Sequence, residues 1–308
     1  MILTLTLNPA VDRNVLVDRL VFEDRAYILS LEHSAGGRGI NASRVLNSFG
    51  AATLAIVTSG GNNGELFETL LRNSGFPVET VNIKEEIRTN FTITDKHGLT
   101  IKLNELGPPL TNKDLERMEE AVSKHLPKAD WLMLCGSIPP GVSPDFYCQL
   151  IRMARGNDVK TLLDTDGDAL QVGVEAEPTV VTPNQQEAER LLNRALITRA
   201  HFRDAALRIK TMGAESVILS LGSRGAVATD ERGTIEVAPP RVDVLSPIGA
   251  GDALAAAFTW ARMNKSDFAD AVRWGVAAGT ATAQLPGLQF ATLDQTREIY
   301  KSVELRDV

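Results

Sequence analysis

Short apolar runs alternate with helical patterns along most of this chain, and this rhythm limits the possible folds more than any other feature. After residue 110 the apolar runs lie at 131–135, 161–164, 179–182 and 216–221. Helical patterns separate them, near 112–126, 145–155, 185–194 and 201–212. Strands that alternate with helices predict a parallel sheet covered by helices on both faces. We therefore expect an α/β fold with three layers.

The N-terminal third adds two amphipathic blocks to this core. Residues 2–7 are a β-rich run, and apolar and polar positions alternate in blocks 11–33 and 84–104. Such alternation is typical of strands that have one face in water, so we expect the two blocks to form a small β lid. The expected core comprises residues 1–10, 34–83 and 105–308. Further predicted elements are a helix at 41–49, a buried strand at 53–57 and helical stretches at 65–73, 251–285 and 292–303.

The charge balance excludes several kinds of partner. Among 308 residues, 32 are Lys or Arg and 39 are Asp or Glu, so the formal net charge is −7. An acidic chain without a basic run is not expected to bind nucleic acid or a membrane surface. Two cysteines and four scattered histidines show neither a disulfide framework nor zinc-site spacing. The chain shows no signal-type N-terminus and no bilayer-spanning run, so we expect a cytoplasmic location.

The segment 246–252, Ser-Pro-Ile-Gly-Ala-Gly-Asp, leads into an apolar helical pattern. Small residues allow the backbone to approach a ligand, and the amides at a helix N-terminus bind anions. Asp252 at this position could accept a hydroxyl proton while those amides stabilise a transferring phosphoryl group. The structural alternative is a glycine turn in which Asp252 caps the helix. Residue types alone leave both interpretations open.

A second glycine-rich segment, Ser-Ala-Gly-Gly-Arg-Gly-Ile-Asn at 34–41, also precedes a helix. Close backbone approach together with the Asn41 amide would suit a polyhydroxy ligand. Gly37, Gly39 and Ala42 match a loose dinucleotide pattern, but no buried strand precedes them and no suitable acid follows. The structural alternative is a loop capped by Asn41. No GxxxxGK[ST] motif occurs in the chain, which excludes a Walker-type ATPase.

Two later segments could contact a nucleotide. Asn184 and Glu187 are three residues apart and share a helix face, where they could order water around a nucleotide-bound Mg²⁺. The same pair also fits an ordinary capping box. Residues 220–226, Ser-Leu-Gly-Ser-Arg-Gly-Ala, run from a strand through a glycine turn into another strand. This turn could hold a ribose or a phosphate, or it could be a hairpin turn without a ligand.

Three single side chains complete the set of candidates. Asp12 follows Asn8-Pro9 and could bind sugar hydroxyl groups, although an acid near a turn is commonly solvated. Arg25 and Arg88 lie one in each amphipathic block, and either guanidinium could bind a phosphate. The alternative is that both arginines lie on the solvated face of a strand.

Taken together and in this order, the motifs resemble the PfkB/ribokinase family of sugar kinases. The resemblance runs from Leu-Thr-Leu-Asn-Pro-Ala-Val-Asp at 5–12 to the helices near 275–286. The GGRGIN and GAGD segments look like the two signature regions of the family. The resemblance implies a ribokinase-like three-layer α/β/α core with a small β-sheet lid. It also implies ATP and Mg²⁺ as cofactors and phosphoryl transfer to an alcohol.

The resemblance also assigns roles to individual residues. It makes Asp252 the catalytic base, and Gly249, Ala250 and Gly251 the anion hole. Asn184 and Glu187 match the NxxE magnesium and phosphate motif, in which Glu187 would reach Mg²⁺ through water. The residues expected beside the nucleotide are Ser220, Gly222 and Gly225. The residues expected to hold the sugar are Asp12, Gly37, Arg38, Gly39 and Asn41.

The opening TLNPAVD, the GSIPPGV at 136–142 and the SPIGAGD segment resemble the phosphosugar branch of the family. That branch includes 1-phosphofructokinase, tagatose-6-phosphate kinase and the minor 6-phosphofructokinase. Arg88 matches the arginine that this branch uses for the substrate phosphate. A kinase of fructose 1-phosphate, fructose 6-phosphate or tagatose 6-phosphate is therefore expected. The alternatives are a kinase of an unphosphorylated sugar or nucleoside, and a non-catalytic sugar- or nucleotide-binding regulator.

Two positions depart from the family pattern. Arg38 stands where the family loop usually carries lysine, so a forked guanidinium replaces a compact ammonium group. At Tyr27 the phosphofructose and tagatose kinases commonly carry arginine. The nearest arginine here is Arg25, two residues back and therefore expected on the same strand face. We expect Arg25 to contact the substrate phosphate across a homodimer formed lid to lid, because the lid would otherwise leave exposed strand edges.

Overall fold

The computed structural model describes residues 1–21 and 23–307, and its main body is a ten-stranded sheet. The strand order is β14-β13-β12-β11-β10-β9-β8-β1-β4-β5. The strands from β11 to β5 are parallel, and β12, β13 and β14 extend one edge antiparallel. Their bounds in chain order are β1 (Ile2–Thr6), β4 (Thr53–Ser59), β5 (Val78–Asn82), β8 (Trp131–Cys135), β9 (Lys160–Asp164), β10 (Val180–Val181), β11 (Val217–Ser220), β12 (Ala226–Thr229), β13 (Thr234–Ala238) and β14 (Glu304–Asp307).

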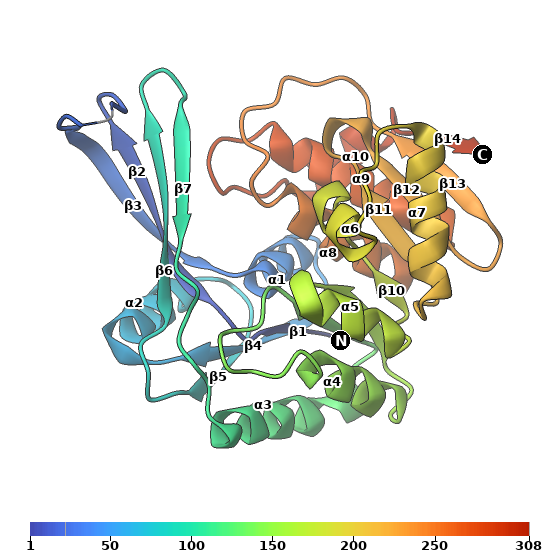
Figure 1. Cartoon of the computed structure of the whole chain (residues 1–308), viewed down its shortest axis with the longest axis horizontal. Coiled ribbons are helices and arrows are strands. Elements are labelled where there is room, and N and C mark those ends of the chain that lie inside the picture. The colour runs from blue at the N-terminus through green and yellow to red at the C-terminus, as the bar shows by residue number, and fades with distance from the viewer. Residues whose placement is uncertain (22, 308) are drawn as a thin grey trace.

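Helices cover both faces of this sheet, which confirms the predicted three-layer core (Figure 1). Successive residues of a strand point to opposite faces. In β8, Leu132 and Leu134 therefore join one apolar layer, while Trp131 and Met133 join the other. The helices over the first face are α2 (Gly61–Leu71), α3 (Asn112–His125), α4 (Phe146–Arg155), α5 (Gly167–Glu175), α6 (Gln185–Leu191) and α7 (Arg199–Thr211). The helices over the second face are α1 (Arg38–Ser48), α8 (Ala250–Met263), α9 (Phe268–Ala283) and α10 (Leu293–Tyr300).

Some helix boundaries differ from the sequence prediction. Helix α1 begins at Arg38, three residues earlier than expected, because Gly37 at its N-cap adopts a φ of 141°. Asn41 therefore lies inside the helix, and the alternative that it caps α1 is wrong. The predicted helical stretch at 251–285 is divided into α8 and α9, with Lys265 between them at a φ of 65°. None of the helices within the described ranges is both long and apolar enough to cross a membrane.

A second, smaller sheet is built from the two amphipathic blocks and projects away from the core (Figure 1). We call it the small sheet. Its strands, in spatial order, are β3 (Ile28–Gly36), β2 (Ala10–Val17), β6 (Arg88–Asp95) and β7 (Thr100–Asn104). The two blocks meet along the parallel pair of β2 and β6, in which Ala10 lies opposite Arg88. Residues about 80 positions apart are therefore neighbours in this sheet.

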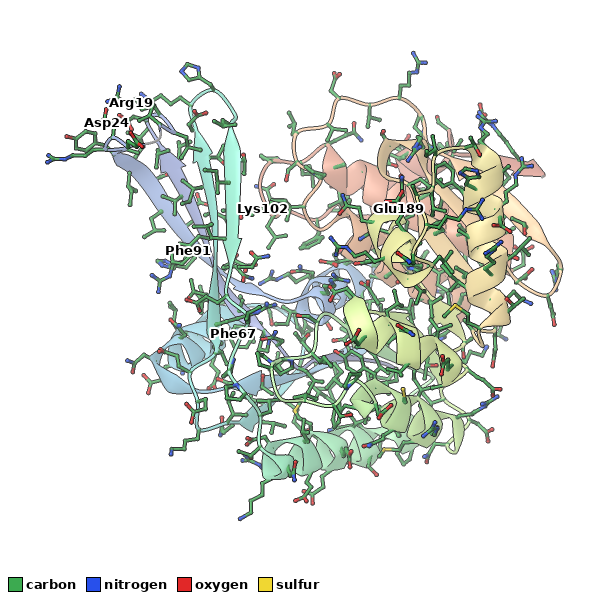
Figure 2. The ribbon with its side chains drawn as sticks, viewed as in Figure 1. Arg19, Asp24, Phe67, Phe91, Lys102 and Glu189 are labelled. Carbon is green, nitrogen blue, oxygen red and sulfur yellow. The ribbon has the colours of Figure 1, made fainter. Side chains whose placement is uncertain are left out.

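The small sheet has one polar and one apolar face. Phe91 and Ile93 of β6 lie opposite Leu103 and Ile101 of β7, so these four apolar side chains share a face. Arg13 and Val15 of β2 lie on the same face. Asp12 and Asn90, one residue before Arg13 and Phe91, point to the other face. Figure 2 shows Phe91 and Lys102 on opposite sides of the sheet, with Lys102 toward the C-terminal half of the chain. The apolar face is therefore turned away from that half.

The structure corrects the predicted position of Arg25. Strand β3 begins at Ile28, so Arg25 and Tyr27 lie in the loop before it and not on one strand face as we expected. The backbone N–H of Arg25 donates to the Asp24 carboxylate at 2.7 Å. Asp24 lies at the free end of the small sheet, far from the core (Figure 2). Within one chain, Arg25 is therefore not brought to the predicted substrate site.

The turn between β11 and β12 offers a matched test of two glycines. The φ of Gly225 is 88°, and a Cβ atom there would lie 1.9 Å from the carbonyl oxygen of Val237. The φ of Gly222 is 60°, but a Cβ atom at this position would meet nothing within 4 Å. Both positions favour glycine, but of the two only Gly225 also lies so close to a neighbouring strand, β13, that a Cβ atom has no room.

We predict that Gly225→Ala destabilises the fold much more than Gly222→Ala. The Gly222 variant should lose about 1 kcal/mol of unfolding free energy, which is the usual cost of left-handed backbone. The Gly225 variant should lose about 3 kcal/mol or more, because overpacking against β13 adds to the strain of a backbone conformation, φ 88° and ψ −129°, that favours glycine strongly. Urea unfolding followed by circular dichroism measures both values. Equal losses in the two variants would contradict the packing argument.

Candidate active site

The candidate side chains gather where the parallel strands end. Asp164 is the last residue of β9, Ser220 is the last residue of β11, and Asn184 follows β10 and bridges to Ser220. Open α/β sheets bind ligands in the crevice outside the carboxyl ends of their strands. The small sheet adds Asp12 from β2 to this side of the molecule. The carboxyl edge therefore combines residues from distant parts of the chain.

The N-terminus of α8 has the geometry that an anion site requires. Gly249 is the N-cap with a φ of 79°, and Ala250 and Gly251 are the first two helical residues. A Cβ atom on Gly251 would meet nothing within 4 Å, so this backbone faces open space. Their amide groups have no partner within the helix, and the helix dipole adds positive potential. The segment can therefore stabilise negative charge next to Asp252.

Asp252 does not act as a simple helix cap. Its Oδ2 atom accepts a hydrogen bond of 2.7 Å from Nδ2 of Asn41 on α1. Burial, followed by the nearby Asp164 carboxylate, raises the pKa of Asp252 to about 7, although the Asn41 hydrogen bond and Arg38 favour the ionised form. The residue keeps a partly exposed edge. A carboxylate that titrates near neutral pH and remains accessible is suited to proton transfer.

Asp12 lies against the glycine-rich segment 34–41, which we call the first glycine loop because it precedes segment 246–252 in the chain. A Cβ atom on Gly36 would come within 2.1 Å of the Asp12 carboxylate, so only glycine allows this approach. Asn90 Nδ2 donates to Asp12 Oδ1 at 2.9 Å. Burial raises the pKa of Asp12, and this hydrogen bond opposes the shift by favouring the ionised carboxylate. Gly39 is equally restricted, because a Cβ atom there would lie 2.5 Å from Thr6 Oγ1. The loop is thus packed directly on β1 and β2.

Arg88 is a cation beside this carboxylate. Its NH1 group donates to the carbonyl oxygen of Glu105 at 3.0 Å, and its Nε atom is buried without a hydrogen-bond partner. Burial lowers the pKa of Arg88, while the Asp12 and Asp166 carboxylates raise it. The guanidinium therefore retains unused donor capacity next to Asp12, as a phosphate-binding group requires.

Arg38 has partners that the sequence did not predict. We expected it beside the sugar, but its NH1 group contacts Asp164 at 3.0 Å and its NH2 group contacts Asp166 at 2.8 Å and Glu187 at 3.2 Å. Burial opposes its charge, yet the surrounding carboxylates, including Asp252, raise the pKa of Arg38. Arg38 therefore links the first glycine loop to the half of the molecule that contains Glu187.

Asn184 and Glu187 form the capping box that was the structural alternative for this motif. Asn184 Oδ1 accepts from the Glu187 N–H at 2.9 Å, and Glu187 Oε2 accepts from the Asn184 N–H at 2.8 Å. The second carboxylate oxygen of Glu187 still faces Arg38. Burial raises the pKa of Glu187, and Arg38 opposes that shift. The box thus holds a buried carboxylate at the site.

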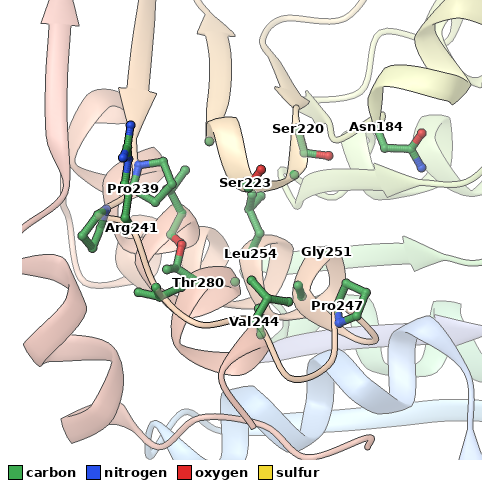
Figure 3. A pocket seen from close by; sticks show the side chains of 18 residues that line it. Asn184, Ser220, Ser223, Pro239, Arg241, Val244, Pro247, Gly251, Leu254 and Thr280 are labelled. Carbon is green, nitrogen blue, oxygen red and sulfur yellow. The ribbon is translucent and has the colours of Figure 1, made fainter. Parts of the chain in front are cut away.

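A cavity of about 870 Å³ lies between the β11–β12 turn and the N-terminal half of α8 (Figure 3). Its volume is within the range of small-molecule sites. Asn184, Ser220, Gly222 and Gly225 line it together with Ala250 and Gly251. The structure thus brings the residues predicted for the nucleotide next to the predicted anion hole. The lining also includes residues that the sequence did not single out, among them Arg241, Val244, Leu254 and Thr280.

Sequence reasoning missed several polar groups of the site. Asp164 ends an apolar strand at the carboxyl edge, and that position was a usable signal. Asn90 and Asp166 stand in segments without a distinctive pattern. Arg44 donates to Asn41 Oδ1 at 3.3 Å, one helical turn after that residue. Asn90, Asp166 and Arg44 become recognisable only through their contacts with Asp12, Arg38 and Asn41.

Comparison with known proteins agrees with this geometry. The model of the pfkB family carbohydrate kinases matches residues 6–295. The chain is 32% identical over 302 residues to ATP-dependent 6-phosphofructokinase isozyme 2 of Escherichia coli strain K12, with 97% of each chain covered. It is 27% identical over 304 residues to 1-phosphofructokinase of Vibrio cholerae, covering 99% of this chain and 96% of that protein.

A solved structure supports the same conclusion. Phosphofructokinase-2 from Escherichia coli, crystallised in complex with potassium, superposes with a TM-score of 0.92 at 32% identity. The match covers 97% of this chain and 98% of that one. The ribokinase-like fold is thereby confirmed. The chain belongs to the pfkB family of carbohydrate kinases and is a phosphotransferase.

Proposed function

We propose that this enzyme transfers the γ-phosphoryl group of ATP to a hydroxyl group of a phosphorylated ketohexose, with Asp252 as the base. The main support is the position of the Asp252 carboxylate. Asp252 follows Ala250 and Gly251 at the N-terminus of α8, and its carboxylate is hydrogen-bonded to Asn41 on α1. The nearby Asp164 and Asp12 carboxylates both raise its pKa. The relatives named 6-phosphofructokinase and 1-phosphofructokinase support fructose 6-phosphate and fructose 1-phosphate as acceptors. Tagatose 6-phosphate offers the same chemistry.

In the proposed reaction, each group of the site has a distinct task. Asp12, Gly37, Gly39 and Asn41 hold the sugar, and Arg88 holds the phosphate that the sugar already carries. Asp252 takes the proton of the acceptor hydroxyl as the hydroxyl oxygen attacks the γ-phosphorus. The bond from the γ-phosphorus to the bridging oxygen breaks at the same time, and ADP leaves. The amides of the α8 N-terminus stabilise the charge on the transferring group. Asp252 returns its proton to solvent before the next turnover.

The nucleotide belongs in the cavity beside α8. Ser220, Gly222 and Gly225 form one wall, and Asn184 stands next to Ser220 (Figure 3). Backbone at these glycines can approach a ribose or phosphate closely. Thr280 and Arg241 line the same cavity and provide further polar contacts. We propose that the terminal phosphate of ATP points toward Ala250 and Gly251, which line the same cavity.

Glu187 is the residue that we assign to Mg²⁺, through water. In the described part of the chain, no group of three or more acidic, histidine or cysteine side chains is arranged to hold an ion alone. Mg²⁺ commonly keeps several waters and binds one or two carboxylates together with substrate phosphates. The buried carboxylate of Glu187, beside Asn184, fits that requirement. When bound, the ion would neutralise charge on the ATP phosphates.

The small sheet is suited to serve as a lid and as a contact with a second subunit. Its polar face carries Asp12 and Asn90 toward the site, whereas Leu31 and Leu103 at its two edge strands are 46% and 54% exposed. Exposed strand edges with apolar side chains favour association. A homodimer joined at the small sheets would cover them. It would also give Arg25, at the free end of the sheet, a route to the substrate phosphate of the other subunit.

For the proposed reaction, the first prediction concerns the acceptor and the base Asp252. ADP release should be fast with one of the three ketohexose phosphates and slow with free fructose or ribose. Asp252→Asn should lower kcat about 10³-fold, because the base is removed, while ATP affinity stays unchanged. Because Asp252 gains its proton as the pH falls through about 7, kcat/KM of the unmodified enzyme should decline about tenfold per unit below that pH. Near-normal turnover of the Asn variant would refute this assignment.

The second prediction separates the two classes of acceptor. Arg88→Ala removes the cation next to Asp12, so it should raise KM for the phosphosugar about 100-fold and leave KM for ATP unchanged. The control is Arg72→Ala, at the exposed C-terminal end of α2, which should change neither value. An unchanged sugar KM in the Arg88 variant would favour an acceptor without a phosphate.

The third prediction concerns the metal. Glu187→Gln keeps a carbonyl oxygen for the Asn184 N–H but removes the charge, so the Mg²⁺ concentration for half-maximal rate should rise about tenfold. Mn²⁺ binding in the presence of ADP, followed by electron paramagnetic resonance, should weaken to the same degree. Glu116→Gln on the exposed face of α3 is the control. An equal effect of both variants would argue against Glu187 as the metal-side residue.

A further inference from the structure

Arg44 is connected to Asp252 through a single side chain. Its NH1 group donates to Asn41 Oδ1 at 3.3 Å, and Asn41 Nδ2 donates to Asp252 Oδ2 at 2.7 Å. Residues three apart on a helix lie on the same face, so α1 presents Arg44 and Asn41 together. Asn41 is only 7% exposed, and Arg44 is half-buried. The three side chains therefore form a short chain of hydrogen bonds inside the protein.

The donor and acceptor properties of these groups determine the direction of the chain. A guanidinium has only donors, so the Asn41 atom that faces Arg44 must be the carbonyl oxygen. The NH₂ group of the same planar amide then points toward Asp252. If the amide were turned over, its oxygen would face the Asp252 carboxylate and its NH₂ group would face a cation. Both contacts of the reversed orientation are repulsive.

We propose that Arg44 is a positioning residue that locks the Asn41 amide so that its N–H group holds the Asp252 carboxylate in place for proton transfer. This inference rests on the proposed role of Asp252 as the base. Arg44 does not contact the reacting atoms in this arrangement, and it acts only through Asn41. It is thereby distinguished from Arg88 and Arg38, which face the substrate phosphate and the acidic cluster.

The charged groups around Asp252 determine how its pKa should respond when the hydrogen bond from Arg44 to Asn41 is lost. Asp164 at the end of β9 and Asp12 on β2 disfavour ionisation of Asp252, while Arg38 on α1 favours it. The nearby thiol of Cys135 stays neutral, because burial raises its pKa. Burial lowers the pKa of Arg44, and electrostatic attraction to the Asp12 carboxylate opposes that shift. The Asn41 hydrogen bond comes from an uncharged group and favours the ionised form of Asp252, so a freely turning amide should raise the pKa of Asp252.

The test measures Asp252 directly in the ligand-free protein. With aspartate labelled by ¹³C at Cγ, the Asp252 signal is identified by its absence from Asp252→Asn. Arg44→Met keeps an unbranched side chain but carries no donor, and it should raise the Asp252 pKa by about one unit. Arg44→Lys, which retains one donor, should give a smaller shift of the same sign and is the test if the Met variant does not fold. Arg72→Met is the surface control.

A double-substitution cycle shows whether Arg44 acts through Asn41. In an Asn41→Ala background, Arg44→Met should cause no further shift, because the side chain that transmits its effect is gone. Shifts that add in the double variant would mean that Arg44 acts by its charge, and they would overturn the proposal. An unchanged Asp252 pKa in both Arg44 variants would overturn it as well.

Kinetics provide the second readout. In Arg44→Met, the acid limb of kcat/KM should move to higher pH by the same amount as the Asp252 signal, while KM for ATP stays constant. The resonance measurement needs no substrate, so it remains informative if no phosphosugar is turned over. In that case the proposed function fails, whereas an observed shift still supports the orienting role of Arg44.

Discussion

The ion pairs of Arg38 are the interaction on which the site depends most. Asp164, Asp166 and Glu187 all contact this one guanidinium, and they lie 126 to 149 residues away from it in sequence. Carboxylates brought together at a half-buried position repel one another unless a cation is held among them. Arg38 provides that cation, and in doing so it ties the first glycine loop to the carboxyl ends of β9 and β10. The two sides of the proposed reaction are joined at this residue.

Several motifs combine a structural task with a proposed chemical one. The Asn184–Glu187 capping box begins α6 and also holds a buried carboxylate at the site. The glycines near Asp12 and Thr6 permit close packing of backbone, and the same openness admits a ligand. For such residues the choice between a structural and a functional interpretation is artificial, because one geometry satisfies both. Asp252 differs from these residues, since its carboxylate binds Asn41 and does not cap α8.

A net charge of −7 describes the whole chain but not its active site. Both proposed substrates are anions, and they must be bound against this overall charge. Arg88 and the amides at the start of α8 provide local positive potential, and the ion that we assign to Glu187 would add to it. Such local arrangements act within a few ångströms, whereas the distributed surface charges are screened by salt beyond about 10 Å. An acidic protein can therefore bind sugar phosphate and ATP.

The amino-acid sequence by itself determined the α/β core, the amphipathic small sheet and the glycine turns before Asn41 and Asp252. These features depend on periodicity and on local backbone preferences, which are encoded over a few neighbouring residues. It did not reveal the partners of Arg38, the contact of Asn90 with Asp12, or the link from Arg44 through Asn41 to Asp252. It also misplaced Arg25, because the start of β3 depends on pairing with β2. Only the tertiary structure decided these points, since a hydrogen bond or ion pair between residues far apart in the chain leaves no periodic signal in either segment.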